Sequence, residues 1–355
     1  MPTTRSYGTL TTSQGAGRVL SPLAAVLGLG LIVILVMTSV AVGSRPIPMA
    51  DVWDGLLHRD RSTESVIIWQ LRMPRTVLAL TVGACLGVAG AVMQALTRNP
   101  LAEPGILGVN AGAAFAVVVA IAGFGATSFT GYVWFACAGA ALASTLVWAV
   151  NQRACGQLGH PTTAGNSQTR LLLAGVALSA CLSACTGIIT MFDEDAFDSY
   201  RFWVVGSLAN RDQSILLAFL PFAGIGLLVA LALGPSLNAL ALGDDQASSL
   251  GLKVAHIRVL CFAVLTLLCG AATAAAGPIA FVGLVVPHAV RLITGPDQRR
   301  VLALSLIAGP ALVLAADIVG RVIARPGEVE AGIVTAFVGA PVLVHLVLRQ
   351  SRRNS

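Results

Sequence analysis

The sequence predicts an all-α, polytopic membrane protein of about ten transmembrane helices, and two observations carry this prediction. First, 56% of the 355 residues are hydrophobic and only 11% are charged, whereas a soluble domain carries about 25% charged residues. Second, long runs such as 19–43 and 259–290 contain no charged residue, and about 20 apolar residues are enough to cross a bilayer as a helix. A surface with so few charges is predicted to face lipid.

Ten apolar segments can be placed along the chain. They cover roughly residues 19–42, 74–97, 106–123, 132–150, 171–191, 214–234, 257–276, 279–293, 301–320 and 331–348. Several are short for a straight span and many contain glycine or proline, so their backbone groups must be buried against neighbouring helices. The eighth segment is the weakest prediction, because only Gly277 and Pro278 separate it from the seventh.

The termini are expected to be cytoplasmic. Ten spans place both termini on one side, and the basic residues of the loops and of Arg349–Arg353 favour the cytoplasm under the positive-inside rule. We expect a mobile tail over 1–17, one transmembrane domain over 18–349 and a second tail over 350–355.

Two long segments are then extracytoplasmic. The first, 43–73, is predicted to contain a short interfacial helix that begins near Asp51, after Pro48. The second, 192–213, carries several acids, followed by Tyr200, Phe202 and Trp203. It is interpreted as a solvated cap whose aromatic side chains lie at the membrane interface.

Several kinds of chemistry are missing from the sequence. The only lysine, Lys253, lies in Gly251-Leu-Lys-Val254, which is not a phosphate-binding loop, so the chain is not expected to hydrolyse ATP or to be an enzyme. The seven cysteines form no CxxC pair and are interpreted as small helix residues; no metal or cofactor site is expected. No stripe of basic and aromatic residues indicates nucleic-acid binding.

An ion-driven secondary transporter is a less favoured alternative. Such a protein needs ionisable groups inside the membrane. Asp317 is the only acid within a predicted span, and Arg321 follows one helical turn later, where the two side chains can pair. A structural ion pair is the simpler interpretation, and nothing in the sequence requires a third possibility, a membrane scaffold that transports nothing.

Seven sequence blocks, in order along the chain, resemble the FecCD permease family. They are Leu71–Ala79, Gly90–Gly108, Arg170–Leu178, Ala241–Leu252, Gly277–Arg291, Ala316–Arg321 and Gly332–Pro341. Members of this family import ferric siderophores, haem and cobalamin. The resemblance covers roughly residues 45–348 and implies the architecture of a type II ABC importer permease in the bacterial cytoplasmic membrane.

The resemblance also implies a substrate and partners. A ferric siderophore is the favoured substrate on family frequency, with haem or cobalamin as alternatives. The implied partners are an ABC ATP-binding subunit that holds ATP and Mg²⁺, an extracytoplasmic substrate-binding protein, and a second permease copy or a paralogue. The family also suggests an inverted repeat, although residue identity does not reveal one here.

Three groups of residues receive roles from the resemblance. Coupling to the ATPase is assigned to a polar island between two spans, although a solvated connector is the alternative; its residues are Gly243, Asp244, Asp245, Gln246, Ala247, Leu250, Gly251 and Leu252. Docking of the binding protein is assigned to Arg72 and Arg321, for which snorkelling or simple ion pairing is the alternative.

The third group belongs to the transport pathway. Ser179, Ser183 and Thr186 are expected to line it, and Gln168 and Thr169 map to the cytoplasmic gate. Close helix packing through small residues is the alternative for this fifth span. One departure concerns the outer mouth: Glu328-Val-Glu-Ala-Gly332 stands where the family often has Glu-Leu-Pro-Ile-Gly.

Overall fold

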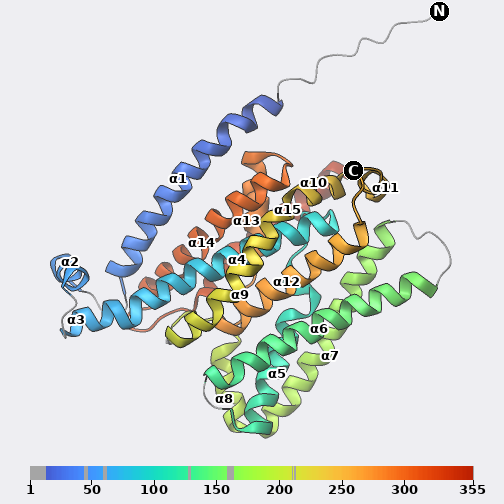
Figure 1. Cartoon of the computed structure of the whole chain (residues 1–355). Coiled ribbons are helices and arrows are strands. Elements are labelled where there is room, and N and C mark those ends of the chain that lie inside the picture. Colours follow the sequence, from blue (N-terminus) through green and yellow to red (C-terminus); the bar gives the residue numbers. More distant parts are fainter. Residues whose placement is uncertain are drawn as a thin grey trace, which may run out of the picture.

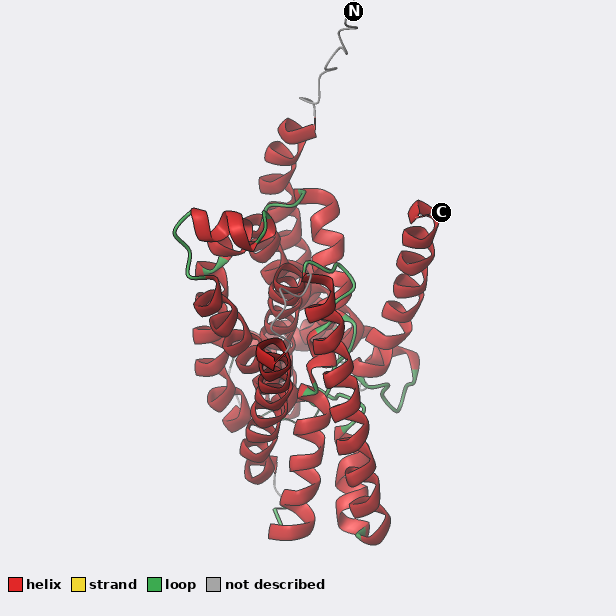
Figure 2. Cartoon of the chain, turned by 90° about the vertical axis from the view of Figure 1, so that its right-hand side faces the viewer, coloured by secondary structure: helices red, strands yellow, loops and turns green. Residues whose placement is uncertain are grey.

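The computed structural model describes residues 13–43, 47–58, 62–126, 129–157, 164–209, 211 and 213–354. Within these ranges the chain is a bundle of helices joined by short connections, and none of these residues forms a strand (Figure 2). The membrane-spanning region begins with α1 (Ser13–Ala41), which lies along one side of the bundle (Figure 1).

The remaining helices follow in chain order. They are α2 (Met49–Leu57), α3 (Thr63–Val66), the π-helical η1 (Ile67–Arg72), α4 (Met73–Thr97), the 3₁₀-helical η2 (Pro104–Leu107), α5 (Val109–Phe124), α6 (Phe129–Gln157), α7 (Ala164–Phe192), α8 (Glu194–Trp203), α9 (Gln213–Ala232), α10 (Gly234–Ala241), α11 (Asp244–Ser249), α12 (Val254–Ala276), α13 (Val282–Thr294), α14 (Gln298–Ile323) and α15 (Ala331–Asn354).

The ten predicted apolar segments correspond to apolar helices of the structure. Seven helical stretches are long and apolar enough to cross a membrane, and α5, α13 and the Ala331–Leu346 part of α15 are shorter apolar helices. The prediction is therefore confirmed, including its weak eighth segment, which is α13. The short helices α5 and α13 each follow a turn inside the protein, where neighbouring helices can satisfy the freed backbone groups.

Helix α4 is the centre of the bundle and is buried along most of its length. It packs against α9, α12, α13 and α14. A Cβ atom added to Gly90 of α4 would lie 1.9 Å from the carbonyl oxygen of Gly283 in α13. The backbones of these two helices are therefore in direct contact, which only glycine allows.

The short helices divide between the two ends of the bundle. The start of α1, the end of α15 and helix α11 lie at one end, here called the α11 end, and α2, α3 and α8 lie at the opposite α8 end (Figure 1). Helix α2 follows Pro48 as predicted. The described N- and C-terminal helices thus point to the same side of the bundle.

The expected cap at 192–213 contains helix α8. The carboxylate of Asp193 accepts a hydrogen bond of 2.8 Å from the backbone N–H of Ala196, which caps the helix. Phe202 is exposed, but Trp203 is buried and does not lie at an interface. The carbonyl of Trp203 lies against Gly277, so the tertiary contact between α8 and the turn before α13 overrides the aromatic-belt interpretation for this residue.

Candidate functional site

The polar island at the α11 end forms a tight turn, here called the coupling turn (residues 243–252). Gly243 (φ 117°) precedes α11 and Gly251 (φ 84°) follows it, and both have the positive φ angles that favour glycine. Asp244 and Asp245 lie in the first turn of α11, where carboxylates interact favourably with the partial positive charge of the helix N-terminus. The turn is therefore a short helix bounded by two glycines in positive-φ conformations.

Asp244 is held by two arginines that sequence reasoning did not assign to this turn. Its Oδ1 accepts from Arg98 Nη2 at 2.6 Å, and its Oδ2 accepts from Arg258 Nη2 at 2.6 Å. Arg98, at the end of α4, also donates to the carbonyl of Leu240 in α10 at 2.6 Å and 3.0 Å. The central helix α4 is thereby tied directly to the coupling turn.

The outward side of the coupling turn has a mixed polar and apolar surface. Leu242 and Leu250 are 59% and 66% exposed, and Asp245 and Gln246 are also exposed, whereas Ala247 is buried against the bundle. Leu242 and Leu250 therefore flank α11 with exposed apolar side chains.

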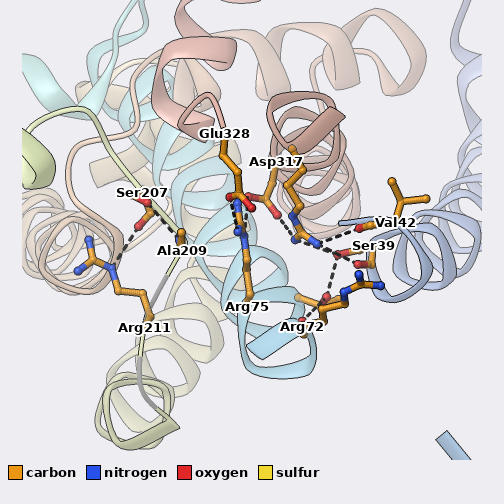
Figure 3. Close-up of polar contacts among 11 residues, drawn as sticks. Ser39, Val42, Arg72, Arg75, Ser207, Ala209, Arg211, Asp317 and Glu328 are labelled. Carbon is orange, nitrogen blue, oxygen red and sulfur yellow. Dashed lines mark hydrogen bonds and ion pairs between the residues drawn. The ribbon is translucent and has the colours of Figure 1, made fainter. Parts of the chain in front are cut away.

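The α8 end contains a largely buried arginine–carboxylate cluster. Arg75, Asp317 and Glu328 are labelled in Figure 3, and Arg321 completes the cluster through its ion pair with Asp317. Arg75 donates to Asp317 Oδ1 through Nε at 3.0 Å and Nη2 at 2.7 Å, and to Glu328 Oε2 through Nη1 at 2.7 Å. Asp317 Oδ2 accepts from Arg321, so this pairing occurs as the sequence allowed. Asp317 is 1% exposed.

The two arginines assigned to docking also hold the end of α1. Arg72 Nη1 donates to the carbonyls of Val40 and Ala41 at 2.7 Å and 2.8 Å. Arg321 Nη1 donates to the carbonyl of Ser39 at 2.9 Å. Arg72 and Arg321 are only 5% and 2% exposed, so in this conformation their guanidinium groups bind the protein itself.

Sequence reasoning assigned no role to Arg75 and did not connect it to Glu328. The two residues are distant in sequence, and no local pattern pairs them. Glu328 lies in the connection after α14, where the neighbouring Val329 N–H donates to the carbonyl of Gly320 at 3.0 Å. The altered outer-mouth sequence is therefore held to α14 by its backbone and to α4 by an ion pair.

The predicted pathway residues share one face of α7, at i, i+4 and i+7, but they differ in exposure. Ser183 is exposed, Ser179 is half-buried and Thr186 is buried, with its hydroxyl donating to the carbonyl of Leu182 at 2.8 Å. The side chains of Gln168 and Thr169 lie outside the described residues. Of the three described side chains, only Ser183 is exposed.

A half-buried carboxylate, that of Glu103, links two turns of the bundle, and sequence reasoning did not single it out. Glu103, in the connection between α4 and η2, accepts a hydrogen bond from the backbone N–H of Phe281 just before α13. Burial raises the pKa of Glu103, and this N–H donor opposes the shift. Glu103 therefore helps to hold the turn at 277–281, where Phe281 has a φ of 67°.

Two variants of Glu103 should distinguish the effect of its charge on stability from the effect of its hydrogen bond. A carboxyl pKa raised by folding means that stability is lost as the pH rises above the ordinary glutamate value of about 4.3. Glu103→Gln keeps an acceptor oxygen and has no charge, so its unfolding temperature should match or exceed that of the wild type at neutral pH. It should also vary less with pH than that of the wild type.

Glu103→Ala leaves the buried N–H of Phe281 without its acceptor, which costs about 1–3 kcal/mol. Thermal unfolding in detergent between acidic and neutral pH measures both effects. Equal unfolding temperatures for Glu103→Gln and Glu103→Ala at every pH would contradict the assignment.

The bundle of apolar helices, with a rigid polar turn at one end, defines a polytopic membrane permease. The chain belongs to the FecCD transport family, whose model matches residues 31–349. It is 44% identical to the ferric enterobactin transport system permease protein FepD of Escherichia coli (strain K12), over 91% of this chain and 94% of that protein.

Two further comparisons also identify permeases of ABC transporters as similar proteins. The chain is 38% identical to the Fe(3+)-citrate import system permease protein YfmD of Bacillus subtilis (strain 168), over 90% of this chain and 91% of that protein. A solved structure described as an inward-facing conformation of a metal-chelate type ABC transporter superposes with a TM-score of 0.79 at 29% identity, over 94% of this chain and 99% of that one. The predicted type II ABC importer permease architecture is confirmed.

Proposed function

We propose that this chain is the permease subunit of an ABC importer that carries a ferric siderophore across the bacterial cytoplasmic membrane. The chain binds no cofactor of its own, and ATP and Mg²⁺ bind to a partner subunit that hydrolyses ATP. Relatives named for ferric enterobactin and ferric citrate favour an iron chelate; haem and cobalamin are the alternatives.

The observation that carries the proposal is the coupling turn. It is exposed and carries apolar side chains, and Arg98 and Arg258 hold it rigidly to the membrane helices α4 and α12. A turn with this geometry can pass a movement of a docked ATPase to the bundle. The α11 end, with both termini, is then cytoplasmic.

A second permease subunit completes the pathway in this proposal. Helices α7 and α15 expose large apolar side chains, among them Ile188, Met191 and Phe337, and a hollow of about 670 Å³ lies on the face of α15 that includes Phe337. Pairing with another copy or with a paralogue would cover these faces and enclose a pathway past Ser183.

The substrate-binding protein docks at the α8 end in this proposal. Docking through Arg72 and Arg321 requires an incoming carboxylate to replace hydrogen bonds that these residues now make to carbonyls of α1 and to Asp317. Charge-assisted arginine–carboxylate bonds are stronger than those to neutral carbonyls, so such an exchange is physically reasonable.

Ion-driven transport by this chain alone is disfavoured by the cluster at the α8 end. Asp317 is buried and its two oxygens are bound by Arg75 and Arg321, which is the arrangement of a structural ion pair and not of an open proton relay. ATP-driven import requires no such relay, because the energy comes from the partner subunit.

Uptake assays test this proposal. A strain that lacks the gene is supplied with radiolabelled ferric siderophores, haem and cobalamin in turn, and is complemented by the wild-type gene or by an empty vector. We expect gene-dependent uptake of at least one ferric siderophore, and loss of that uptake when the partner ATPase carries an inactive catalytic site.

Uptake of haem or cobalamin alone would establish the alternative substrate class. Gene-dependent uptake that continues with the inactive ATPase would instead indicate secondary transport and would overturn the ABC mechanism. If no substrate of the panel depended on the gene, the iron-chelate assignment would be wrong.

A further inference from the structure

A deep groove runs between α6 and α12 on the side of the bundle where α12 lies between α6 and α9 (Figure 1). Its volume is about 670 Å³, and seven residues of α6, seven of α12 and Phe222 of α9 line it. The hollow is formed because several residues of α6 and α12 that face each other have small side chains, which do not fill the space between the helices. These small residues include Ala138, Ala141, Ala263 and Gly270.

The wall of the groove is apolar, although it contains hydroxyl groups. Ser144 and Thr266 hydrogen-bond to each other across the helices at 2.8 Å, and Ser144 also donates to the carbonyl of Ala140 at 2.8 Å. With these hydroxyls occupied by protein partners, the groove presents mainly carbon atoms to an occupant. An apolar cavity of this kind does not bind water well.

Aromatic side chains line the groove toward the α8 end of the bundle. Trp134 and Phe222 meet there edge to face with ring centroids 5.8 Å apart, and a cavity of about 60 Å³ adjoins them. From Trp134 to Trp148 the groove follows α6 for roughly 21 Å at the rise of an α-helix. The hydrocarbon core of a bilayer is about 30 Å deep, so the groove spans more than half of it and can hold one acyl chain.

The other end of the groove, at the start of α12, lies near groups that suit an anionic lipid headgroup. His256 lies on the same face of α12 as Val259 and Ala263, which line the groove, and it is exposed about one turn before Val259. Lys253, the only lysine of the chain, is exposed at the start of the same helix. The nearby Asp244 is already neutralised by Arg98 and Arg258, so it does not cancel this charge.

We propose that the groove between α6 and α12 binds one acyl chain of an anionic phospholipid, whose headgroup contacts Lys253 and His256. The groove lies within membrane-spanning helices, where phospholipid is the surrounding solvent. The bound chain fills the gap between α6 and α12, and its headgroup lies beside the coupling turn, which continues directly into α12. This proposal does not depend on the identity of the transported substrate.

Native mass spectrometry of the full chain, titrated with phosphatidylglycerol or phosphatidylcholine in detergent, tests the proposal. We expect one phosphatidylglycerol molecule to bind with higher affinity than phosphatidylcholine. Ala263→Phe fills the groove and should weaken phosphatidylglycerol binding by about tenfold or more. Gly30→Phe on α1 is the matched control, since a Cβ there meets no atom within 4 Å, and it should bind lipid as the wild type does.

A second variant tests the headgroup contacts without disturbing the fold. Lys253→Gln combined with His256→Gln should lower the preference for phosphatidylglycerol by about fivefold, as expected for loss of one basic residue near a membrane surface, and should leave phosphatidylcholine binding unchanged. Equal binding of the two lipids by the wild type would overturn the proposal, as would unchanged binding by a folded Ala263→Phe. A photo-crosslinker at position 263 that captured protein instead of lipid in membranes would also overturn it.

Discussion

Replacement of Asp317 by alanine is expected to remove most of the folded protein from the membrane. The carboxylate is buried and accepts hydrogen bonds from Arg75 and Arg321, which are themselves largely buried. Its loss leaves two cations competing for Glu328. Breaking a buried ion pair in this way costs about 3–5 kcal/mol, a large share of the roughly 5–15 kcal/mol that stabilises a typical protein.

Thermal unfolding and size-exclusion profiles of the purified variant measure this effect. Asp317→Asn keeps an acceptor oxygen and should lie between the wild type and Asp317→Ala. Asp198→Ala is the matched control: the Asp198 side chain is 63% exposed and pairs with Arg201 at 3.2 Å, and such surface pairs contribute little. An unfolding temperature of Asp317→Ala equal to that of the control would show that the cluster does not stabilise the fold.

Gly251→Val is expected to abolish most transport while leaving the protein in the membrane. A Cβ at this position meets no atom within 4 Å, so the substitution causes no clash. The φ of 84° is nonetheless a region that β-branched residues rarely adopt, at a cost of about 1–3 kcal/mol. The exposed turn can relieve this strain by changing the direction of α11, which would displace the surface offered to the ATPase.

Uptake by Gly251→Val should fall by about tenfold or more, the factor that ~1.4 kcal/mol of lost docking produces. Gly251→Asn is the control, because asparagine tolerates positive φ angles far better, and its uptake should stay near that of the wild type. Immunoblots of membranes and co-purification with the ATPase separate uncoupling from misfolding. Normal uptake by Gly251→Val, at normal abundance, would remove the coupling turn from the mechanism.

Features set by neighbouring residues could be predicted from the sequence. The ten apolar segments, the interfacial helix after Pro48 and the acids at the start of α11 all depend on local composition and spacing. The predicted apolar segments are confirmed because an apolar run of about 20 residues can cross a bilayer almost only as a helix.

Features set by long-range contacts could not be predicted in this way. Tryptophan is a residue type that is common at membrane interfaces, but Trp203 is buried against the turn at Gly277. Arg98 lies far from Asp244 in the sequence, yet it anchors the coupling turn. Glu103 could not be recognised as a partner of Phe281, because the contact joins two interior turns 178 residues apart.

The sequence by itself therefore determined a ten-segment membrane protein through hydropathy, and its ordered motifs indicated the permease family. Only the tertiary structure decided which charges are buried and what they bind. Arg72 and Arg321 show the difference: their positions along the chain indicated the outer end, but their burial against α1 and Asp317 depends on how the three segments α1, η1 and α14 pack. In a low-dielectric interior, partner choice follows that packing and not sequence spacing.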